Sequence, residues 1–144
     1  MPQSRVLNVA SSRDINAPAE KVWAVIGDFN SLPQWHPAIA ASRLVTEGGA
    51  TWRRVTLVDG SELSERLDSH SDSERTYSYA IPEGPLPIRD YHSRIAVKEA
   101  GAGRCLVEWS AHFVAFGVPD SVAEAEILGI YLAGLDALTQ TFPG

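Results

Sequence analysis

The segment from Pro18 to Pro37 constrains the fold of this chain more than any other stretch. Pro18 is typical of the first turn of a helix, because the N–H that proline lacks would have no partner there. Glu20 follows in the same turn, where a negative charge is favourable against the helix dipole. The apolar side chains of this segment fall on one helical face: Val22, Trp23, Val25, Ile26 and Phe29. We therefore expect two short consecutive helices, over residues 18–28 and 30–36.

The rest of the chain is predicted to be mainly β-structure with one terminal helix. Strand-like patterns separated by short turns occur seven times, at residues 4–15, 39–47, 51–58, 63–72, 76–81, 88–99 and 104–116. Asp59-Gly60 between two of these segments is a strong hairpin signal. A helix is predicted from Asp120 or Ser121 to about Thr141. Consecutive strands joined by short turns favour an antiparallel meander, and the long helix must cover one face of it.

This order of elements predicts an α+β helix-grip fold. In this fold a curved seven-stranded antiparallel sheet wraps around a long C-terminal helix, and two short helices lie between the first and second strands. The length of 144 residues predicts a single domain, residues 1–144. A strongly curved sheet that holds one helix leaves an interior space, so we expect a ligand cavity between them.

Several short motifs are shared with a known superfamily over nearly the whole chain, from about residue 6 to residue 142. They are Val22-Trp23, Asp28-Phe29, Trp35-His36-Pro37, Asp59-Gly60, Glu65-Arg66-Leu67, Tyr91 and Trp109. With these motifs the chain resembles the START-like (SRPBCC) superfamily, and within it the polyketide cyclase/dehydrase and lipid-transport family. It is also distantly similar to the plant abscisic-acid receptors. The superfamily includes hormone receptors, lipid carriers, aromatases, cyclases, dehydratases and co-chaperones, so the resemblance implies a fold and leaves the activity open.

The chain departs from the receptors at three places. The receptors have a lysine near the start of the second strand that pairs with a ligand carboxylate, whereas residues 39–42 contain none. Their gate loop is longer than residues 58–61, and their latch carries a histidine and an arginine where this chain has Leu86-Pro87. We therefore expect neither abscisic acid as the ligand nor a hormone-gated phosphatase as a partner.

Strand periodicity predicts which side chains point inward. Arg53 alternates in phase with Val55 and Leu57, and Glu65 with Leu63 and Leu67, so both charged residues are expected inside, where they could pair if directly or diagonally opposed. The last hairpin and the terminal helix supply further apolar faces. Alignment with the receptors implies additional lining positions along residues 77–93. Together these arguments give the candidate ligand-binding residues: Arg53, Val55, Leu57, Leu63, Glu65, Tyr77, Tyr79, Ile81, Ile88, Tyr91, Ser93, Trp109, Phe113, Ile127, Ile130, Tyr131 and Gly134.

Each of these side chains also has a purely structural interpretation. Arg53 and Glu65 form either a structural ion pair or a polar anchor for a ligand, since buried charges need partners. Trp109 and Phe113 suit a cavity wall or plain core equally, and Gly134 is expected to leave room for a ligand. Glu65 and Arg53 are the candidates for catalysis, if the protein is an enzyme.

The aromatic and histidine side chains outside the sheet interior are expected to be structural. Trp23 and Trp35 are expected as core anchors beneath the short helices rather than as ligand contacts. His36 is interpreted as a helix-end histidine, with an acid or base role at the cavity mouth as the alternative. The other three histidines, His70, His92 and His112, are predicted to point outward.

Composition argues against several classes of protein. Two lysines and ten arginines against 18 acidic residues give a net charge of −6 and no basic patch, so nucleic-acid binding is not expected. The single cysteine excludes an intramolecular disulfide, and the histidines lack metal spacing, so neither a metal nor a cofactor is expected. Residues 1–8 lack the apolar run of a signal peptide, and no stretch has membrane-spanning length. We therefore expect a cytoplasmic location and no membrane insertion.

Three functions remain open on these observations. The first is a non-catalytic carrier or sensor that binds a small, mainly hydrophobic or aromatic molecule. The second is a cyclase, aromatase or dehydratase that uses the same cavity, without metal or redox cofactor. The third is an interaction module in which loops 58–62 and 83–88 contact a partner, and the chain is accordingly expected as a monomer or homodimer.

Overall fold

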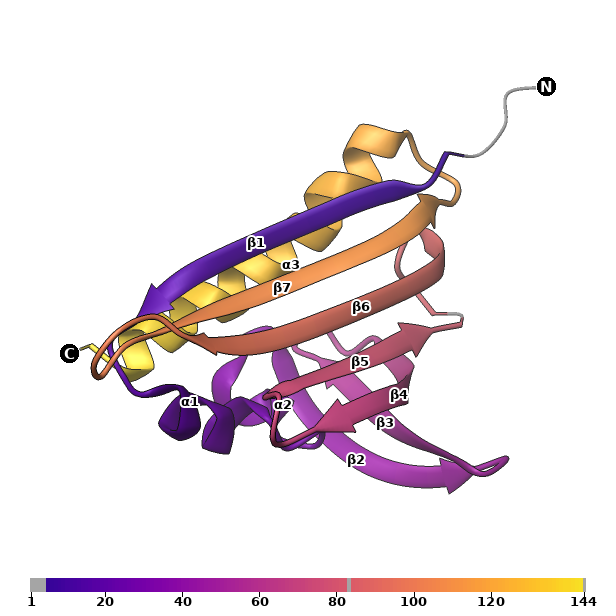
Figure 1. Ribbon diagram of the computed structural model, residues 1–144. Coiled ribbons are helices and arrows are strands. Elements are labelled where there is room, and N and C mark those ends of the chain that lie inside the picture. The colour runs from indigo at the N-terminus through magenta and orange to yellow at the C-terminus, as the bar shows by residue number, and fades with distance from the viewer. Residues whose placement is uncertain (1–4, 83, 144) are drawn as a thin grey trace.

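The computed structural model describes residues 5–82 and 84–143. Two predicted segments extend beyond these residues. Residue 4 of the first predicted strand and residue 83 of the loop at residues 83–88 lie outside the described residues. Within them the strands form one antiparallel seven-stranded sheet in the order β1-β7-β6-β5-β4-β3-β2 (Figure 1). The strands are β1 Leu7–Ile15, β2 Ile39–Glu47, β3 Ala50–Leu57, β4 Glu62–Ser71, β5 Thr76–Ile81, β6 Ile88–Glu99 and β7 Cys105–Ala115. The predicted helix-grip order is confirmed, and the predicted ends differ from the observed ones by at most three residues.

Two short helices separate β1 from β2, as the Pro18–Pro37 segment predicts. They are α1 Ala19–Ile26 and α2 Leu32–Trp35, the second a single turn. Pro18 lies just before α1 with an extended backbone rather than in its first turn. Its carbonyl accepts hydrogen bonds from the N–H groups of Lys21 and Val22, so it still positions the start of the helix.

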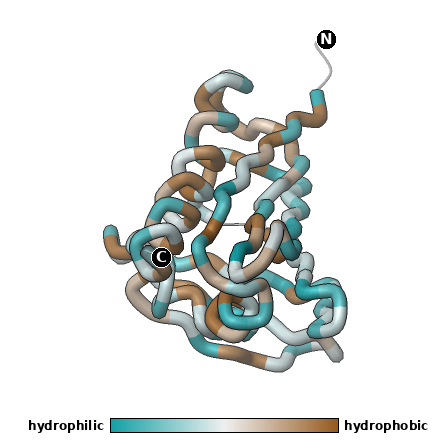
Figure 2. The backbone as a smooth tube through the Cα atoms, turned by 60° about the vertical axis from the view of Figure 1, so that its left-hand side comes forward, coloured by the Kyte–Doolittle hydropathy of each residue, from teal (hydrophilic) through white to brown (hydrophobic). Residues whose placement is uncertain are grey.

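The long helix α3 Asp120–Thr141 packs against the inner face of the curved sheet, along β1 and β7 (Figure 1). Its buried residues recur at intervals of three and four and form one stripe: Ala123, Ile127, Tyr131, Gly134, Leu135 and Leu138. The facing strands alternate between buried and exposed residues, as in β7, where Cys105, Val107, Trp109, Ala111 and Phe113 are buried. In Figure 2 the hydropathy colour accordingly changes over short intervals along the strands and the helix.

Irregularities in three strands modify the simple alternation of side chains. In β4 the register shifts between Leu67 and Ser69, and this reverses the phase of the residues beyond it. His70 therefore lies on the same face of the sheet as Tyr77, stacks on its ring, and shares a hydrogen bond of 2.7 Å with the Gly27 carbonyl, although the residue stays exposed. The predicted face of His70 was wrong, because periodicity alone does not detect an extra residue in a strand. His92 and His112 do point outward, and their rings stack on each other.

A second register shift lies in β6, between Arg89 and His92, and Asp90 there adopts a positive φ of 54°. The extra residue buries both Ile88 and Tyr91, which strict alternation would place on opposite faces.

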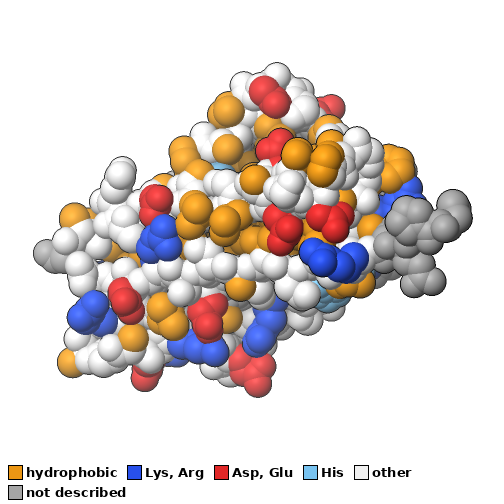
Figure 3. Space-filling model, turned by 90° about the horizontal axis from the view of Figure 1, so that it is seen from above, with side chains coloured by type: hydrophobic (Ala, Val, Ile, Leu, Met, Phe, Trp, Pro, Cys, Tyr) orange, Lys and Arg blue, Asp and Glu red, His pale blue; other side chains and the backbone are white. Residues whose placement is uncertain are grey.

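The surface mixes charges of both signs. On the face seen in Figure 3, basic side chains lie between acidic ones. Ion pairs on the surface include Arg13 with Asp136 and Lys98 with Glu108.

None of the helices in the described part of the chain has both the length and the apolar character needed to cross a membrane.

Candidate functional site: an interior cavity between the sheet and the terminal helix

A cavity of about 160 Å³ lies between the sheet and α3, beside α2. Its wall is mainly apolar and combines residues from almost every element. The lining residues are Leu32, His36, Ala38, Ile39, Leu57, Val58, Asp59, Leu63, Glu65, Tyr79, Ile81, Leu86, Tyr91, Trp109, Ile127 and Ile130. Val58 and Asp59 are exposed, so the cavity opens at the β3–β4 turn.

The Arg53–Glu65 pair closes one end of the cavity. The two residues are directly opposed on β3 and β4, and Arg53 Nε donates to Glu65 Oε1 at 2.5 Å. Arg53 is completely buried, whereas the Glu65 side chain keeps 9% exposure and lines the cavity. Glu65 therefore lies at the wall, with Arg53 behind it.

Arg53 is held by groups on three sides. Its Nη1 donates to the Phe29 carbonyl at 3.0 Å and to the Tyr77 hydroxyl at 3.2 Å. Its guanidinium carbon lies 4.2 Å from the Phe29 ring centroid and 4.8 Å from that of Tyr79, within cation–π range. Burial alone would lower the pKa of Arg53, but the Glu65 carboxylate and the tyrosines outweigh it and raise the pKa above its ordinary value. The pair is therefore a fixed structural unit, and the structure leaves Nη2 without a hydrogen-bond partner among the described residues.

A chain of hydroxyl groups runs from the cavity wall into the sheet. Ser93 Oγ donates to the Ser110 carbonyl at 3.0 Å, so it accepts from Tyr131, whose hydroxyl lies 2.8 Å away. Tyr131 in turn accepts from Tyr91 through a very short hydrogen bond. Trp109 Nε1 donates to both Tyr79 and Ser93 at 3.1 Å. Burial raises the pKa of Tyr79, Tyr91 and Tyr131, so these hydroxyls stay protonated.

His36 is held in one protonation state by two backbone groups. Its Nδ1 accepts from the Ala38 N–H at 3.1 Å, and its Nε2 lies 2.7 Å from the Ile130 carbonyl. A carbonyl only accepts, so Nε2 carries the proton and the ring is neutral. Burial lowers the pKa of His36 from its usual 6.5, against the opposing effect of the Ile130 carbonyl. Because both nitrogens are engaged, the ring has no free position for acid or base chemistry, and it links the segment after α2 to α3.

This arrangement predicts a pH dependence of stability. Below about pH 6.5 the unfolded chain takes up a proton at His36 that the folded protein resists, so the free energy of unfolding should fall with decreasing pH. One such group contributes a slope of at most about 1.4 kcal/mol per pH unit, and the loss ends once the pH falls through the lowered folded-state pKa. Denaturant unfolding of the wild type across this range measures the effect.

Two asparagine variants isolate the contribution of His36. In His36→Asn the side-chain oxygen can still accept from the Ala38 N–H, but it does not titrate, so the slope below pH 6.5 should shrink. His92→Asn, on the exposed face of β6, should retain the wild-type slope. Equal slopes in all three proteins would refute this account of His36.

The structure brings nine of the 17 candidate ligand-binding residues to the cavity wall: Leu57, Leu63, Glu65, Tyr79, Ile81, Tyr91, Trp109, Ile127 and Ile130. The other eight do not line it, and they are Arg53, Val55, Tyr77, Ile88, Ser93, Phe113, Tyr131 and Gly134. Most of these eight pack in the core beside the cavity, while Arg53, Ser93 and Tyr131 support its polar side chains. Their roles in ligand binding stay predictions.

Gly134 does not leave space in the manner expected. A Cβ atom at this position would lie 2.6 Å from His36 Cδ2 and 3.0 Å from ring atoms of Trp35 and Trp109. The room created by the missing side chain is filled by these three rings. Gly134 therefore permits close packing of α3.

Strand periodicity could not identify the remaining lining residues. Leu32, His36 and Ala38 come from α2 and the turn after it, where no alternating pattern applies, and Ile39 is the first residue of β2. Val58, Asp59 and Leu86 fall in the two loops that the sequence pointed to as partner-binding segments. Trp23 and Trp35 lie in the core outside the cavity wall, as predicted, and Trp23 Nε1 donates to Asp72.

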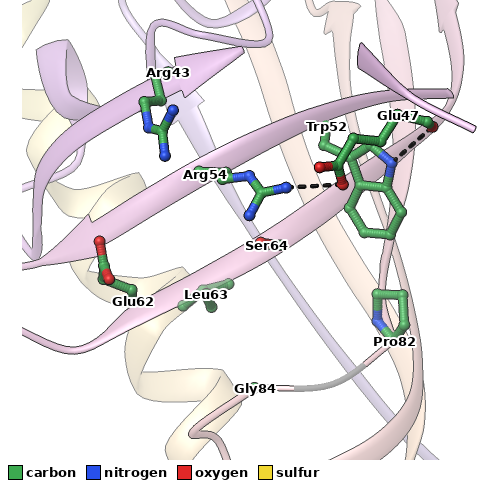
Figure 4. Close-up of a pocket in the computed structure, with 9 residues that line it drawn as sticks. All are labelled: Arg43, Glu47, Trp52, Arg54, Glu62, Leu63, Ser64, Pro82 and Gly84. Atoms are coloured by element: carbon green, nitrogen blue, oxygen red, sulfur yellow. Dashed lines mark hydrogen bonds and ion pairs between the residues drawn. The ribbon is translucent and has the colours of Figure 1, made fainter. Parts of the chain in front are cut away.

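A larger open groove lies on the outer face of the sheet, over β2, β3 and β4 (Figure 4). It has a volume of about 640 Å³, and two interactions join polar groups of its wall. Arg54 Nη2 lies 2.8 Å from the Glu47 carboxylate, and Trp52 Nε1 donates to the Glu47 carbonyl. Because this groove is open and its wall is mainly polar, we regard the interior cavity, with its apolar wall, as the candidate site. Nowhere in residues 5–82 and 84–143 do three or more His, Cys, Asp or Glu side chains form a potential metal site.

Comparison with known proteins agrees with this architecture. Residues 6–143 match the family described as polyketide cyclase / dehydrase and lipid transport. The solved structure of the protein XoxI from Bacillus cereus is 43% identical, with a TM-score of 0.90 over 94% of this chain and 95% of that one. An uncharacterised protein from Bacillus thuringiensis is 41% identical, with a TM-score of 0.90 over 96% of this chain and all of that one.

A more distant relative comes from plants. The abscisic acid receptor PYL2 of Arabidopsis thaliana is 30% identical over 90 residues, which is 59% of this chain. The match covers 47% of the receptor, so this chain spans about half of its length. The chain belongs to the polyketide cyclase / dehydrase and lipid transport family.

Proposed function

We propose that the protein is a non-catalytic carrier or sensor that binds a small, mainly hydrophobic molecule in the interior cavity. The observation that carries this proposal is the composition of the wall, where apolar side chains surround a few convergent polar groups. Most of those polar groups already bond to the protein, as His36 does through both ring nitrogens. Among the described residues we find no nucleophile that is hydrogen-bonded to an oriented base.

A cavity-filling variant tests this proposal. Ile130→Trp places a large ring in the cavity from α3, while Leu132→Trp adds the same ring to the same helix at a position that does not line it. A panel of small aromatic and alicyclic compounds should shift amide resonances of cavity residues in NMR titrations of the wild type and Leu132→Trp. The shifts should vanish in Ile130→Trp. Ligands that instead shift Arg43 and Trp52 of the outer groove, or that ignore Ile130→Trp, would contradict the proposal.

One observation favours an enzymatic alternative, a cyclase, aromatase or dehydratase. The Glu65 carboxylate and the hydroxyls of Tyr79 and Tyr91 share the cavity wall, and such groups can exchange protons with a bound substrate. Arg53, which sits behind Glu65, would act there as a positioning residue. Once a substrate is found, Glu65→Gln should lower kcat strongly, and unchanged turnover would exclude this role for Glu65. Contact of loops 58–62 and 83–88 with a partner stays a prediction. Light scattering can test whether that partner is a second copy of the chain.

A further inference from the structure

We infer that the cavity selects an uncharged, single-ring molecule with a hydroxyl donor and rejects the matching carboxylate. This inference rests on the proposed function, because it specifies the ligand of the same cavity. It follows from the polar atoms that the wall presents, from their hydrogen-bond directions, and from the size of the space.

The charged side chains at the wall are acidic. Glu65 lies inside and Asp59 at the mouth, and no lysine or arginine belongs to the described lining. The nearest buried cation, Arg53, directs its Nε and Nη1 to Glu65, Phe29 and Tyr77. A ligand carboxylate would therefore meet another carboxylate, while Arg53 Nη2, which has no partner among the described residues, is buried behind Glu65 and does not line the cavity.

Glu65 retains acceptor capacity toward the cavity. An ionised carboxylate offers about four lone-pair sites on two oxygens. Arg53 Nε occupies Oε1, and no hydrogen bond to Oε2 is found among the described residues. Since the side chain is still 9% exposed and lines the cavity, a ligand donor can reach it.

The hydroxyl chain fixes the roles of the two tyrosines at the wall. Tyr91 gives its proton to Tyr131, because Tyr131 gives its own to Ser93 and Ser93 gives its own to the Ser110 carbonyl. Tyr91 therefore presents only lone pairs to the cavity. Tyr79 accepts from Trp109, and its own proton can go to the neighbouring Tyr91 oxygen or to a ligand.

Acceptors therefore exceed donors in the cavity, and this decides the chemistry of the ligand. A hydroxyl group can donate to Glu65 or Tyr91 and accept from Tyr79. A carboxylate would need several donors and would find at most one, and a buried charge without partners is strongly unfavourable. An anion is thus excluded by the hydrogen-bond pattern as well as by charge.

The volume limits the ligand to about one ring. An apolar cavity of about 150 Å³ accommodates benzene, and the present cavity measures about 160 Å³. The rings of Tyr79, Tyr91 and Trp109 line the same space, so an aromatic ligand would find aromatic partners.

Three probes with the same ring and ethyl group test the inference: 4-ethylphenol, ethylbenzene and 4-ethylbenzoate. At neutral pH 4-ethylphenol presents a hydroxyl donor, ethylbenzene presents no polar group, and 4-ethylbenzoate presents a negative charge. NMR titration of isotope-labelled wild-type protein gives both affinity and location. We expect 4-ethylphenol to bind in the cavity about tenfold or more tighter than ethylbenzene, the gain of a hydrogen bond to a charged acceptor, and 4-ethylbenzoate to leave cavity resonances unchanged.

Two variants assign the selectivity to particular atoms. Glu65→Gln keeps an acceptor for Arg53 but converts one carboxylate oxygen into an amide donor, so the preference for the phenol over the benzoate should shrink. Tyr91→Phe removes the second acceptor without leaving a charge unpaired, and it should weaken 4-ethylphenol but not ethylbenzene. This second variant keeps the test valid if Glu65→Gln folds poorly.

The outcomes separate the two proposals. If 4-ethylbenzoate binds in the cavity as tightly as 4-ethylphenol, the inferred selectivity is wrong while a ligand cavity remains. If ethylbenzene binds as tightly as the phenol, the donor contributes nothing and the inference also fails. If no probe and no member of the wider compound panel shifts a cavity residue, the proposed function fails and the inference fails with it.

Discussion

Replacing Glu65 with methionine should destabilise the protein by about 3–5 kcal/mol, the effect of removing one partner of a buried ion pair. The cost arises because Arg53 is fully buried and cannot release its proton, so its charge would remain in the core without the Glu65 carboxylate. Arg53→Met should cost less, because a buried glutamate left alone can take up a proton and become neutral. Urea or guanidinium unfolding measures both variants.

The double variant and a surface control complete this test. Arg53→Met/Glu65→Met removes both charges together, so it should recover much of the stability that Glu65→Met loses. Glu47→Met breaks the exposed pair with Arg54, in which Glu47 is 59% exposed, and should change stability by about 1 kcal/mol or less. A Glu65→Met variant as stable as Glu47→Met would show that the buried pair is not a determinant of stability.

Gly134→Ala should destabilise the protein by about 1–3 kcal/mol, although alanine is the better helix former. The added Cβ would lie 2.6 Å from His36 Cδ2 and 3.0 Å from Trp35 and Trp109, and these are ring atoms with little freedom to move. The substitution should also strain the hydrogen bond between His36 and the Ile130 carbonyl. Denaturant unfolding at neutral pH gives the difference in stability.

Gly129→Ala is the matched control in the same helix. No atom outside the local backbone lies within 4 Å of a Cβ at this position. This variant should therefore show only the helix-propensity effect, a gain of up to about 1 kcal/mol. If the two alanine variants differ by less than the uncertainty of the unfolding measurement, close packing at Gly134 is not limiting.

The sequence predicted the sheet side of the site well, because each strand alternates between two environments. Arg53 and Glu65 were expected inside and directly or diagonally opposed, and they are direct neighbours in the register of β3 and β4. Alternation fails where a local irregularity breaks the period. The β4 bulge puts the exposed His70 on the same face as Tyr77, against the prediction, and the β6 bulge buries Ile88 together with Tyr91, which alternation by itself would separate. A single extra residue reverses phase without leaving a clear mark in the pattern.

The roles of individual side chains could not be predicted to the same extent. Whether Arg53 or Glu65 faces the cavity depends on depth, which alternation does not encode, and the structure puts Arg53 behind Glu65. The engagement of both His36 nitrogens depends on Ala38 nearby and on Ile130, which is 94 residues away in the chain. Gly134 looked like open space, but three rings from distant segments fill it.

The Pro18–Pro37 segment and the periods of the strands determined the helix-grip order of elements and the identity of most inward-facing residues. These are local properties, because turn chemistry and side-chain alternation act over a few residues. The tertiary structure alone decided the size of the cavity, its excess of hydrogen-bond acceptors and the neutral state of His36. Those properties depend on how closely α3 approaches the curved sheet, and that distance is set by contacts between residues far apart in the chain.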